Sequence, residues 1–264
     1  MFLLLSIFSV VTTFRGCLSV EQLFSKTGQG LEGRIYGGHK TVIELHPYQV
    51  SLHSRGEYIC GGAIISAEFI VTASHCVSDP VSFLKIRAGS SFRLFGGSVH
   101  TVKEVYRHED FWMNEHDNAF YDIAVIRVKE SFHFDDTRLP IKLFDAGEKL
   151  QPGALAVLSG WGELEDGRLP VQLQAVVLPI VQKEVCENAY KKLQGGIGED
   201  QICAGYQGLA RKDACHGDSG SPLVVDDRLA GIVTYGEDCA HPDYPGVYSE
   251  IAFFHKWIEE RVTF

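Results

Sequence analysis

Short runs of apolar or alternating residues, separated by Gly, Ser and Asp turns, occupy most of the chain. Such runs predict β-strands, because successive side chains of a strand point to opposite faces. The first set includes Tyr48–Leu52, Gly62–Ile65, Ile70–Ala73, Leu84–Ala88 and Ile123–Val128. The second set comprises Ala154–Ser159, Gln172–Ile180, Gln201–Tyr206, Pro222–Val225, Arg228–Tyr235 and Gly246–Ile251. Two sets of about six strands predict an all-β protein made of two β-barrels or sandwiches.

Helical spacing occurs only at the end of the chain. Apolar residues three or four positions apart predict a closing amphipathic helix there. They are Ile251, Phe254, Trp257, Ile258 and Val262. Ser131–Gln151, which carries charges, Pro140 and Gly147, is predicted to connect the two β units.

The N-terminal apolar run, Met1–Phe14, is too short to span a bilayer. It resembles a secretory signal peptide without a basic start, and the small residues Cys17 and Ser19 indicate cleavage after Ser19. Residues 1–19 are therefore predicted to be a signal peptide, with a buried N-terminal strand or helix as the alternative. No other stretch is long and apolar enough for a span, so we expect a secreted, extracellular protein without a membrane partner.

Charge and cysteine content narrow the class of protein further. A net charge of −10 without a basic run disfavours nucleic acid as a partner. If Cys17 leaves with the signal peptide, six of the seven cysteines remain, and an oxidising compartment would pair them. Their spacing does not fix the connectivity. No Cys-x-x-Cys pair occurs, which disfavours a zinc site.

The candidate chemistry centres on Ser219, which follows Gly217-Asp218 and precedes Gly220. A serine between small residues sits on a tight turn, where the N–H groups of Gly217 and Ser219 can hold a developing oxyanion. A serine hydroxyl needs a base to become a nucleophile. His75, beside Cys76, and Asp122, before an apolar run, are the candidates for base and orienting carboxylate. Each alone is a weak signal, since such residues are more often structural.

The order His75, Asp122, Ser219 and the residues that flank them resemble the chymotrypsin-fold serine proteases, in particular the trypsin-like branch. The resemblance runs from Ile35 to the C-terminus and implies a protease domain over residues 35–264. It implies two six-stranded antiparallel β-barrels with the active site between them and a C-terminal α-helix. The N-terminal barrel would span about residues 35–140, and the C-terminal barrel with the helix about 141–264. Ser219 would attack, His75 would accept its proton, and Asp122 would orient His75.

The resemblance also implies a primary specificity. Asp213, six residues before Ser219, stands where trypsin-like enzymes place the carboxylate that pairs with a substrate Lys or Arg. Gly236 and Gly246 match the two glycines that leave room for that side chain. The alternative is that Asp213 is a solvated loop carboxylate.

Two residues beside this pocket complete the predicted substrate-binding set. Tyr235 would form an apolar wall, and Thr234 replaces the usual serine near Asp122. The backbone of Thr234 and Gly236 would pair with the substrate as an added strand.

A propeptide is the interpretation of the polar segment 20–34, which a flexible linker would also explain. The resemblance implies cleavage after Arg34, which frees the amine of Ile35 to pair with Asp218 and order the oxyanion turn. It further implies three disulfides: Cys60–Cys76, Cys186–Cys203 and Cys215–Cys239.

The sequence departs from the family pattern at a cysteine pair and in a loop, and two further features remain open. Ala156 and Val225 replace a cysteine pair of many trypsins, which predicts an apolar contact instead. The loop Ser90–Val99 lacks the glutamates with which vertebrate trypsins bind calcium, so we predict no metal site and no cofactor.

Residues 108–117 are dense in His, Asp and Glu but irregularly spaced, which favours a solvated loop at the cleft. Glu237 and Asp238 would either favour further basic substrate residues or be plain surface charge.

Together these observations predict a secreted serine endopeptidase that cleaves after Lys or Arg and is made as a zymogen, with a digestive role. Its partners would be protein and peptide substrates, an activating trypsin-like protease or itself, and protein inhibitors; the enzyme would be a monomer. The alternatives are a regulatory cascade protease of the same specificity and a non-catalytic homologue that acts as a binding protein.

Overall fold

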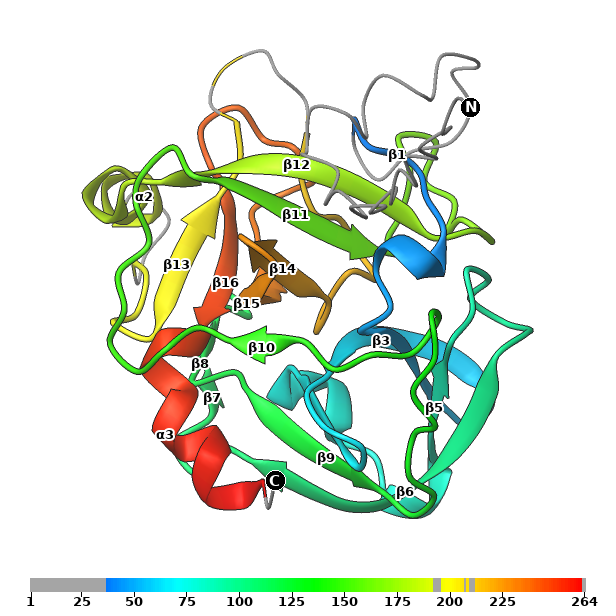
Figure 1. The fold of residues 1–264 in the computed structure, drawn as a ribbon. Helices are drawn as coiled ribbons and strands as arrows, with labels where there is room; N and C mark the ends of the chain where they lie inside the picture. Colours follow the sequence, from blue (N-terminus) through cyan, green and yellow to red (C-terminus); the bar gives the residue numbers. More distant parts are fainter. Residues whose placement is uncertain (1–36, 192–195, 207, 209–211, 263–264) are drawn as a thin grey trace, which may run out of the picture. The chain divides into compact units, whose positions relative to one another are not determined.

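The computed structural model describes residues 37–191, 196–206, 208 and 212–262 (Figure 1). The chain divides into two units, Met1–Glu32 and Gly33–Phe264, and all described residues belong to the second. The predicted signal peptide, the predicted propeptide and the Arg34–Ile35 junction lie outside the described residues. Among the described residues, no helix has the length and apolar character needed to cross a membrane.

The first barrel is closed by six antiparallel strands in the order β2-β3-β4-β9-β6-β5. The alternation of apolar and polar residues explains why these segments form strands. In β5, Leu84, Ile86 and Ala88 are buried, whereas Lys85 and Arg87 are partly exposed. The prediction missed the long strand β6, whose buried and exposed positions alternate less regularly. The strands are β2 (Gln49–Ser54), β3 (Glu57–Ile64), β4 (Phe69–Thr72), β5 (Leu84–Ala88), β6 (Ser98–Arg107) and β9 (Ala124–Val128).

The second barrel has the order β12-β11-β14-β15-β16-β13 and closes through pairing of β12 with β13. Its strands are β11 (Leu155–Gly160), β12 (Gln174–Val181), β13 (Gln201–Ala204), β14 (Pro222–Val225), β15 (Arg228–Tyr235) and β16 (Gly246–Glu250). Two short strands extend this sheet: β1 (His39–Lys40) on β12 and β10 (Lys142–Leu143) on β15. The all-β prediction of two six-stranded antiparallel barrels is confirmed.

The remaining elements are short. The closing helix α3 (Ile251–Arg261) was predicted; α2 (Lys183–Tyr190) was not, because only Cys186 and Tyr190 of its eight residues are buried. A small hairpin joins β7 (Trp112–Met113) to β8 (Ala119–Phe120). Three 3₁₀ helices complete the list: η1 (Ile43–Leu45), η2 (Ser74–Val77) and η3 (Val81–Phe83).

All three expected disulfides are formed: Cys60–Cys76 in the first barrel, and Cys186–Cys203 and Cys215–Cys239 in the second. Ala156 and Val225, where a further bridge is common, are both buried in the apolar core.

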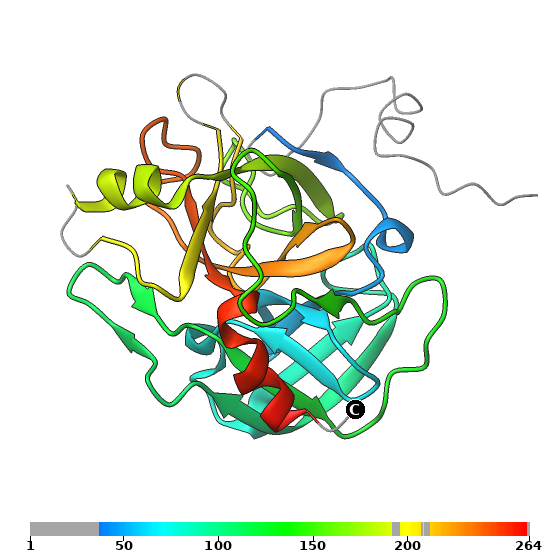
Figure 2. The same ribbon diagram turned by 60° about the vertical axis from the view of Figure 1, so that its left-hand side comes forward.

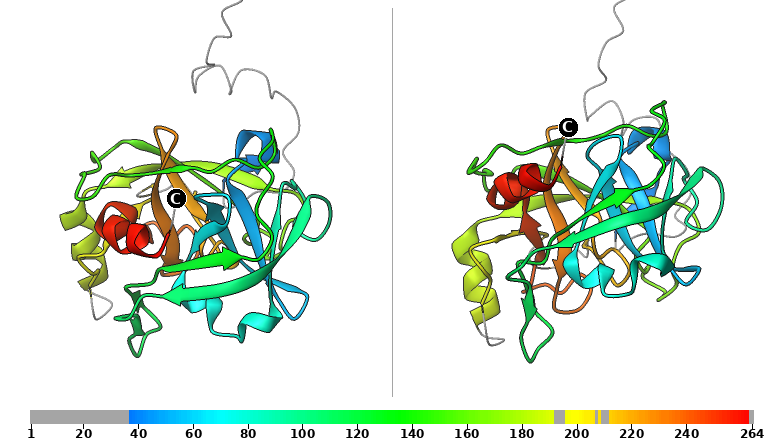
Figure 3. Two further views of the ribbon diagram at one scale, coloured as in Figure 1. Left: turned by 60° about the horizontal axis from the view of Figure 1, so that its bottom comes forward. Right: turned by 90° about the horizontal axis from the view of Figure 1, so that it is seen from below.

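The two barrels lie side by side (Figures 2 and 3), and the short strand β10, labelled in Figure 1, lies between them. Hydrogen bonds join them directly: the Gly61 N–H of β3 donates to the Ser219 carbonyl at 2.8 Å, and Ser159 Oγ of β11 donates to Gln49 Oε1 of β2 at 2.7 Å. Groups from both barrels therefore meet at this interface, which is where the predicted site residues lie.

Candidate active site

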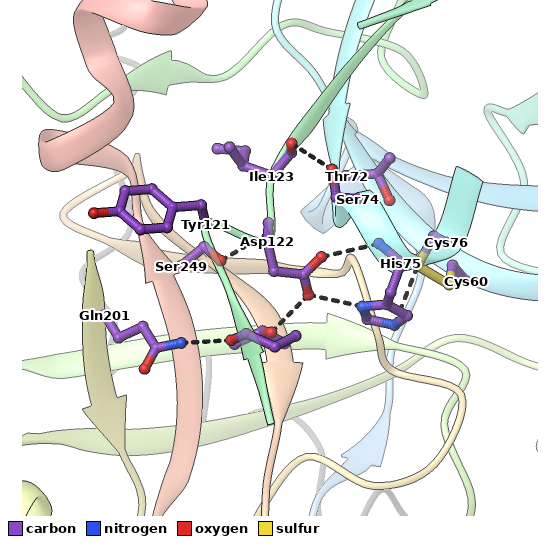
Figure 4. Close-up of polar contacts among 12 residues, drawn as sticks. Cys60, Thr72, Ser74, His75, Cys76, Tyr121, Asp122, Ile123, Gln201 and Ser249 are labelled. Carbon is purple, nitrogen blue, oxygen red and sulfur yellow. Dashed lines mark hydrogen bonds and ion pairs between the residues drawn. A yellow bond between two sulfur atoms is a disulfide. The ribbon is translucent and has the colours of Figure 1, made fainter. Parts of the chain in front are cut away.

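His75 and Asp122 form a hydrogen-bonded pair on the first barrel. His75 is on η2, directly after β4, and Asp122 precedes β9, the strand that pairs with β4. His75 Nδ1 lies 2.7 Å from Asp122 Oδ2, and the His75 backbone N–H donates to Asp122 Oδ1 at 2.9 Å (Figure 4). The carboxylate thus fixes both the position of the residue and the direction of its ring.

The Asp122 carboxylate is completely buried yet ionised. Burial would raise its pKa, but the charge of His75 and hydrogen bonds from His75 and Thr234 outweigh that and lower it. The Thr234 hydroxyl donates to Asp122 Oδ2 at 2.6 Å. For His75, burial would lower the pKa, but the charge and hydrogen bond of Asp122 outweigh it and raise the pKa above 6.5. Nδ1 therefore carries the proton in the neutral ring, which leaves Nε2 as the basic nitrogen.

The turn of Ser219 packs against the segment that leads to His75. A Cβ on Gly220 would lie 2.3 Å from Thr72 Oγ1, at the end of β4. Thr72 Oγ1 in turn donates to the Gly61 carbonyl at 2.8 Å. The second barrel thus delivers the serine to the strand end that carries the histidine.

The Gly217 N–H, predicted as an oxyanion donor, belongs to the His216–Gly217 peptide. The carbonyl of that peptide accepts a 2.8 Å hydrogen bond from the Glu163 N–H. A trans peptide points its N–H and C=O to opposite sides, so this bond directs the Gly217 N–H away from Glu163. Gly217 has a φ of +92°, and a Cβ there would lie 3.0 Å from Leu169 Cδ2. The position therefore requires glycine.

The Ser219 N–H, the second predicted donor, belongs to the Asp218–Ser219 peptide. The carbonyl of this peptide accepts from the Ser221 N–H at 2.9 Å, and the Ser219 carbonyl accepts from Gly61. Within the described residues, neither the Gly217 nor the Ser219 N–H donates to another backbone group. Both N–H groups are held in place by their neighbours and left available for an anion.

Asp213 lies with Ser219 on a cavity of about 260 Å³. Its side chain is almost fully buried and accepts the N–H groups of Ala214 (2.8 Å) and Ala240 (3.3 Å). Burial raises the pKa of Asp213 to about 8. A buried carboxylate at the wall of a cavity favours a cationic ligand, because a cation would offset the cost of burying its charge. This burial excludes the solvated-loop interpretation.

The two predicted glycines also lie on this cavity. A Cβ on Gly246 would be 2.8 Å from Asp213 Oδ1 and 3.2 Å from the Tyr248 hydroxyl, so a side chain there would block the carboxylate. A Cβ on Gly236 would make only ordinary van der Waals contact, 3.8 Å from Gly246 Cα. Tyr235 lines the same cavity. Access to Asp213 therefore requires glycine at position 246.

Asp218, beside the serine, is completely buried. It accepts the N–H groups of Gly162 (2.8 Å) and Cys215 (3.1 Å), and burial raises its pKa to about 7. In the part of the chain that the structure describes, no Lys, Arg or His forms an ion pair with it. Its predicted partner, the Ile35 amine, lies outside the described residues.

The segment 108–117 has no buried residue, as expected of a solvated loop. It contains β7, and Glu109 accepts from Trp257 Nε1 of α3 at 2.7 Å. His116 and Asp117 line the cavity. Among the described residues, one group of three side chains of types that bind metals lies close together: Cys60, His75 and Cys76. Its two cysteines are joined in a disulfide, so they do not offer free thiolates.

Sequence reasoning missed several groups that build the site. Ser249 Oγ donates to the Asp122 carbonyl at 2.8 Å, and Ser74 Oγ donates to the Ile123 carbonyl at 2.9 Å (Figure 4). Tyr58 donates its hydroxyl to the Gly217 carbonyl at 2.6 Å. These residues contact partners 49 to 159 positions away in the chain, and no local motif marks them.

Two β-barrels that bring a histidine–aspartate pair, a serine turn and a buried pocket carboxylate to one interface define a serine endopeptidase of the chymotrypsin fold. The trypsin family model matches residues 35–258. Trypsin epsilon of Drosophila erecta is 42% identical over 232 residues, which cover 87% of this chain and 88% of that protein. The vitellin-degrading protease of Bombyx mori is 39% identical, with 87% and 86% covered.

A solved structure agrees with these matches. Neuropsin, a serine protease expressed in the limbic system of mouse brain, superposes with a TM-score of 0.76 at 29% identity, covering 85% of this chain and 98% of that one. The chain belongs to the trypsin family, and it is a trypsin-like serine endopeptidase.

Proposed function

We propose that the enzyme cleaves peptide bonds through a triad of Ser219, His75 and Asp122. Ser219 Oγ attacks the carbonyl carbon while His75 Nε2 takes the hydroxyl proton. The oxyanion accepts the N–H groups of Gly217 and Ser219, and His75 then gives its proton to the leaving amine. A water repeats the sequence to release the acid and restore Ser219. Asp122 keeps His75 in the required tautomer and stabilises the imidazolium.

The primary specificity that fits the cavity is for Lys or Arg before the cut bond. The observation that carries this proposal is the buried Asp213 carboxylate on the cavity that also reaches Ser219. The pKa of about 8 shows that burial disfavours the charged form of Asp213, and a cation that enters the cavity would stabilise that form. Thr234, Tyr235 and Gly236 line the approach, where the substrate backbone would pair as an extra strand.

The inactivity of the uncut zymogen would depend on Asp218. A carboxylate that is buried with only two N–H donors is poorly compensated, and the amine of Ile35, freed by a cut after Arg34, would supply the missing charge. Because Asp218 lies between the two oxyanion donors, this ion pair would stabilise the turn that carries them. Residues 20–34 would then be the propeptide.

We assign the enzyme to an extracellular, digestive role as a monomer, with protein inhibitors as further partners. Three disulfides favour an oxidising compartment, to which the predicted signal peptide of residues 1–19 would direct the chain. A propeptide that ends in Arg34 is a substrate for the enzyme itself, which suits rapid activation in bulk. Cleavage of denatured casein after many Lys and Arg residues would support digestion, and restriction to a single site would favour a regulatory protease.

The test uses the secreted chain before and after a cut at Arg34, with peptide anilides that carry Arg, Lys or Phe before the scissile bond. We expect activity on Arg and Lys alone, appearing only after the cut. Ser219→Ala should abolish it, whereas Ser131→Ala, at an exposed serine of the first barrel, should not. Silence of the cut chain on all three peptides would favour the non-catalytic homologue, and cleavage after Phe would overturn the role of Asp213.

A further inference from the structure

Tyr58 is a buried side chain of β3 that reaches across the interface between the barrels. Its ring, 9% exposed, packs in a small apolar cluster with Ile43, Trp161 and Leu173. A Cβ added to Gly217 would lie 3.7 Å from Tyr58 Cε1, so the ring also lies close to the oxyanion turn. The position of the hydroxyl is therefore set by packing before any substrate arrives.

The Tyr58 hydroxyl donates to the Gly217 carbonyl at 2.6 Å. That carbonyl belongs to the Gly217–Asp218 peptide, which lies between the two peptides that supply the oxyanion donors. The N–H of the same peptide donates to the Cys215 carbonyl at 2.9 Å. The middle peptide is thus held at both ends, once by the turn itself and once by the first barrel.

The backbone conformation of Gly217 explains why hydrogen bonds at both ends of this peptide are important for the oxyanion donors. Its φ of +92° requires glycine, and glycine also offers the least resistance to rotation of the adjoining peptides. A rotation about Gly217 would turn its N–H out of the site. Oxyanion donors accelerate the reaction only when they are already aimed at the developing charge.

The Tyr58 hydroxyl remains a donor over the working range of the enzyme. Burial and the negative charge of Asp218 raise its pKa well above 10.0, against a weaker opposing effect of Arg93. The hydroxyl therefore keeps its proton at neutral pH and can donate to the Gly217 carbonyl.

We propose that Tyr58 is a positioning residue that fixes the oxyanion hole by clamping the Gly217–Asp218 peptide. This inference rests on the proposed roles of Gly217 and Ser219. Tyr58 is not among the residues that line the Asp213 cavity. Its loss should therefore weaken stabilisation of the transition state without weakening substrate binding.

The test is Tyr58→Phe in the enzyme cut at Arg34, which removes one hydroxyl and keeps the ring. We expect kcat on an Arg anilide to fall roughly tenfold, less than the loss on removing a hole donor itself, with KM unchanged. A peptide aldehyde with a C-terminal Arg forms a tetrahedral adduct with Ser219 and should bind more weakly by the same factor. Benzamidine, a cation that occupies only the primary pocket, should bind as before.

The matched control is Tyr106→Phe, which removes a hydroxyl bonded to Glu104 on the surface of the same barrel. It should leave kcat, KM and the affinities for the aldehyde and for benzamidine unchanged. Unaltered kcat and aldehyde affinity in Tyr58→Phe would overturn the inference. So would an equal loss of aldehyde and benzamidine affinity, since that marks a merely structural role. Activity that survives Ser219→Ala would instead overturn the proposed function.

Discussion

Asp122 on the first barrel and the pair Asp213 and Asp218 on the second differ in how their buried charge is compensated. All three are at most 3% exposed. Asp122 has His75 and Thr234 as partners, and its pKa is lowered. Among the described residues, the hydrogen-bond donors to Asp213 and Asp218 are all backbone N–H groups, and burial raises the pKa values of these carboxyls to about 8 and about 7.

The difference shows where each partner comes from. The fold itself supplies the side-chain partners of Asp122, His75 and Thr234, so that half of the site is complete in the folded chain. The other two carboxylates are buried at a cost, which is the arrangement expected where a cation arrives later. In our proposal the substrate brings one to Asp213 and the cut N-terminus brings one to Asp218.

The largest effect should follow from Asp122→Asn, which removes the buried negative charge that is hydrogen-bonded to His75 and Thr234. An amide cannot serve as a charged acceptor for both His75 Nδ1 and Thr234, so the wrong tautomer of His75 is favoured. We expect kcat on an Arg anilide at pH 8 to fall by about 10⁴-fold, the loss typical of such a substitution in this triad. A loss below about tenfold would show that Asp122 does not orient the base.

Asp213→Asn should separate function from stability on the other side. Losing a buried ion pair with substrate corresponds to roughly 10²- to 10⁴-fold in kcat/KM for Arg peptides. The raised pKa of Asp213 means that the native protein loses stability as pH rises from 3.8 to about 8. The variant should escape this loss, so its advantage in urea unfolding should grow with pH over that window.

The control for Asp213→Asn is Asp145→Asn, at an exposed carboxylate. It should alter neither kcat/KM nor the pH dependence of unfolding. Equal stability of wild type and Asp213→Asn at pH 9 would contradict the comparison between the barrels.

Asp218→Asn should behave oppositely before and after the cut. In a chain made uncleavable by Arg34→Gln, the raised pKa of Asp218 costs stability as pH rises from 3.8 to about 7, and the amide should remove that cost. In the cut enzyme the amide loses its charged partner, and activity should fall roughly 10- to 100-fold. A gain in stability in both forms would argue against an ion pair with Ile35.

A smaller effect should come from Thr234→Val, which removes one donor to Asp122. The loss of one hydrogen bond to a charged group corresponds to roughly tenfold in kcat. The carboxylate would then act more strongly on His75, whose pKa is already raised, and the rise of kcat/KM with pH should shift to higher pH. Thr234→Ser keeps the hydroxyl and should restore both values; an unshifted profile in Thr234→Val would contradict the coupling.

The smallest effect should come from Glu237 and Asp238, which are exposed at the rim of the cavity. Exposed charges interact weakly and are screened by salt. We expect Glu237→Gln with Asp238→Asn to lower kcat/KM only about threefold for peptides with a second basic residue before the cut, and only at low ionic strength. A salt-independent loss would show that these groups contact the substrate closely.

The strand pattern predicted two β units and the closing helix, and the resemblance to the chymotrypsin-fold proteases resolved the two units as barrels. Apolar and polar residues alternate one by one in strands such as β5, and this pattern can be read from the sequence. The residues that flank His75, Asp122 and Ser219 in the chain form local motifs that can also be read from it. The role of Asp213, six residues before Ser219, is what the resemblance to trypsin-like enzymes implies. Helix α2 escaped prediction because few of its residues are buried, and the irregular strand β6 escaped for a similar reason.

Tertiary structure decided what no local pattern records. Tyr58 reaches Gly217 across 159 positions, and Thr234 reaches Asp122 across 112, because closure of the two barrels places these segments side by side. The charge state of a carboxylate likewise depends on what surrounds it: Asp122, Asp213 and Asp218 are the same residue in sequence, and burial with or without a cation sets their pKa values apart. The sequence indicated the candidate site residues, and the packing of one barrel on the other set their geometry and their pKa values.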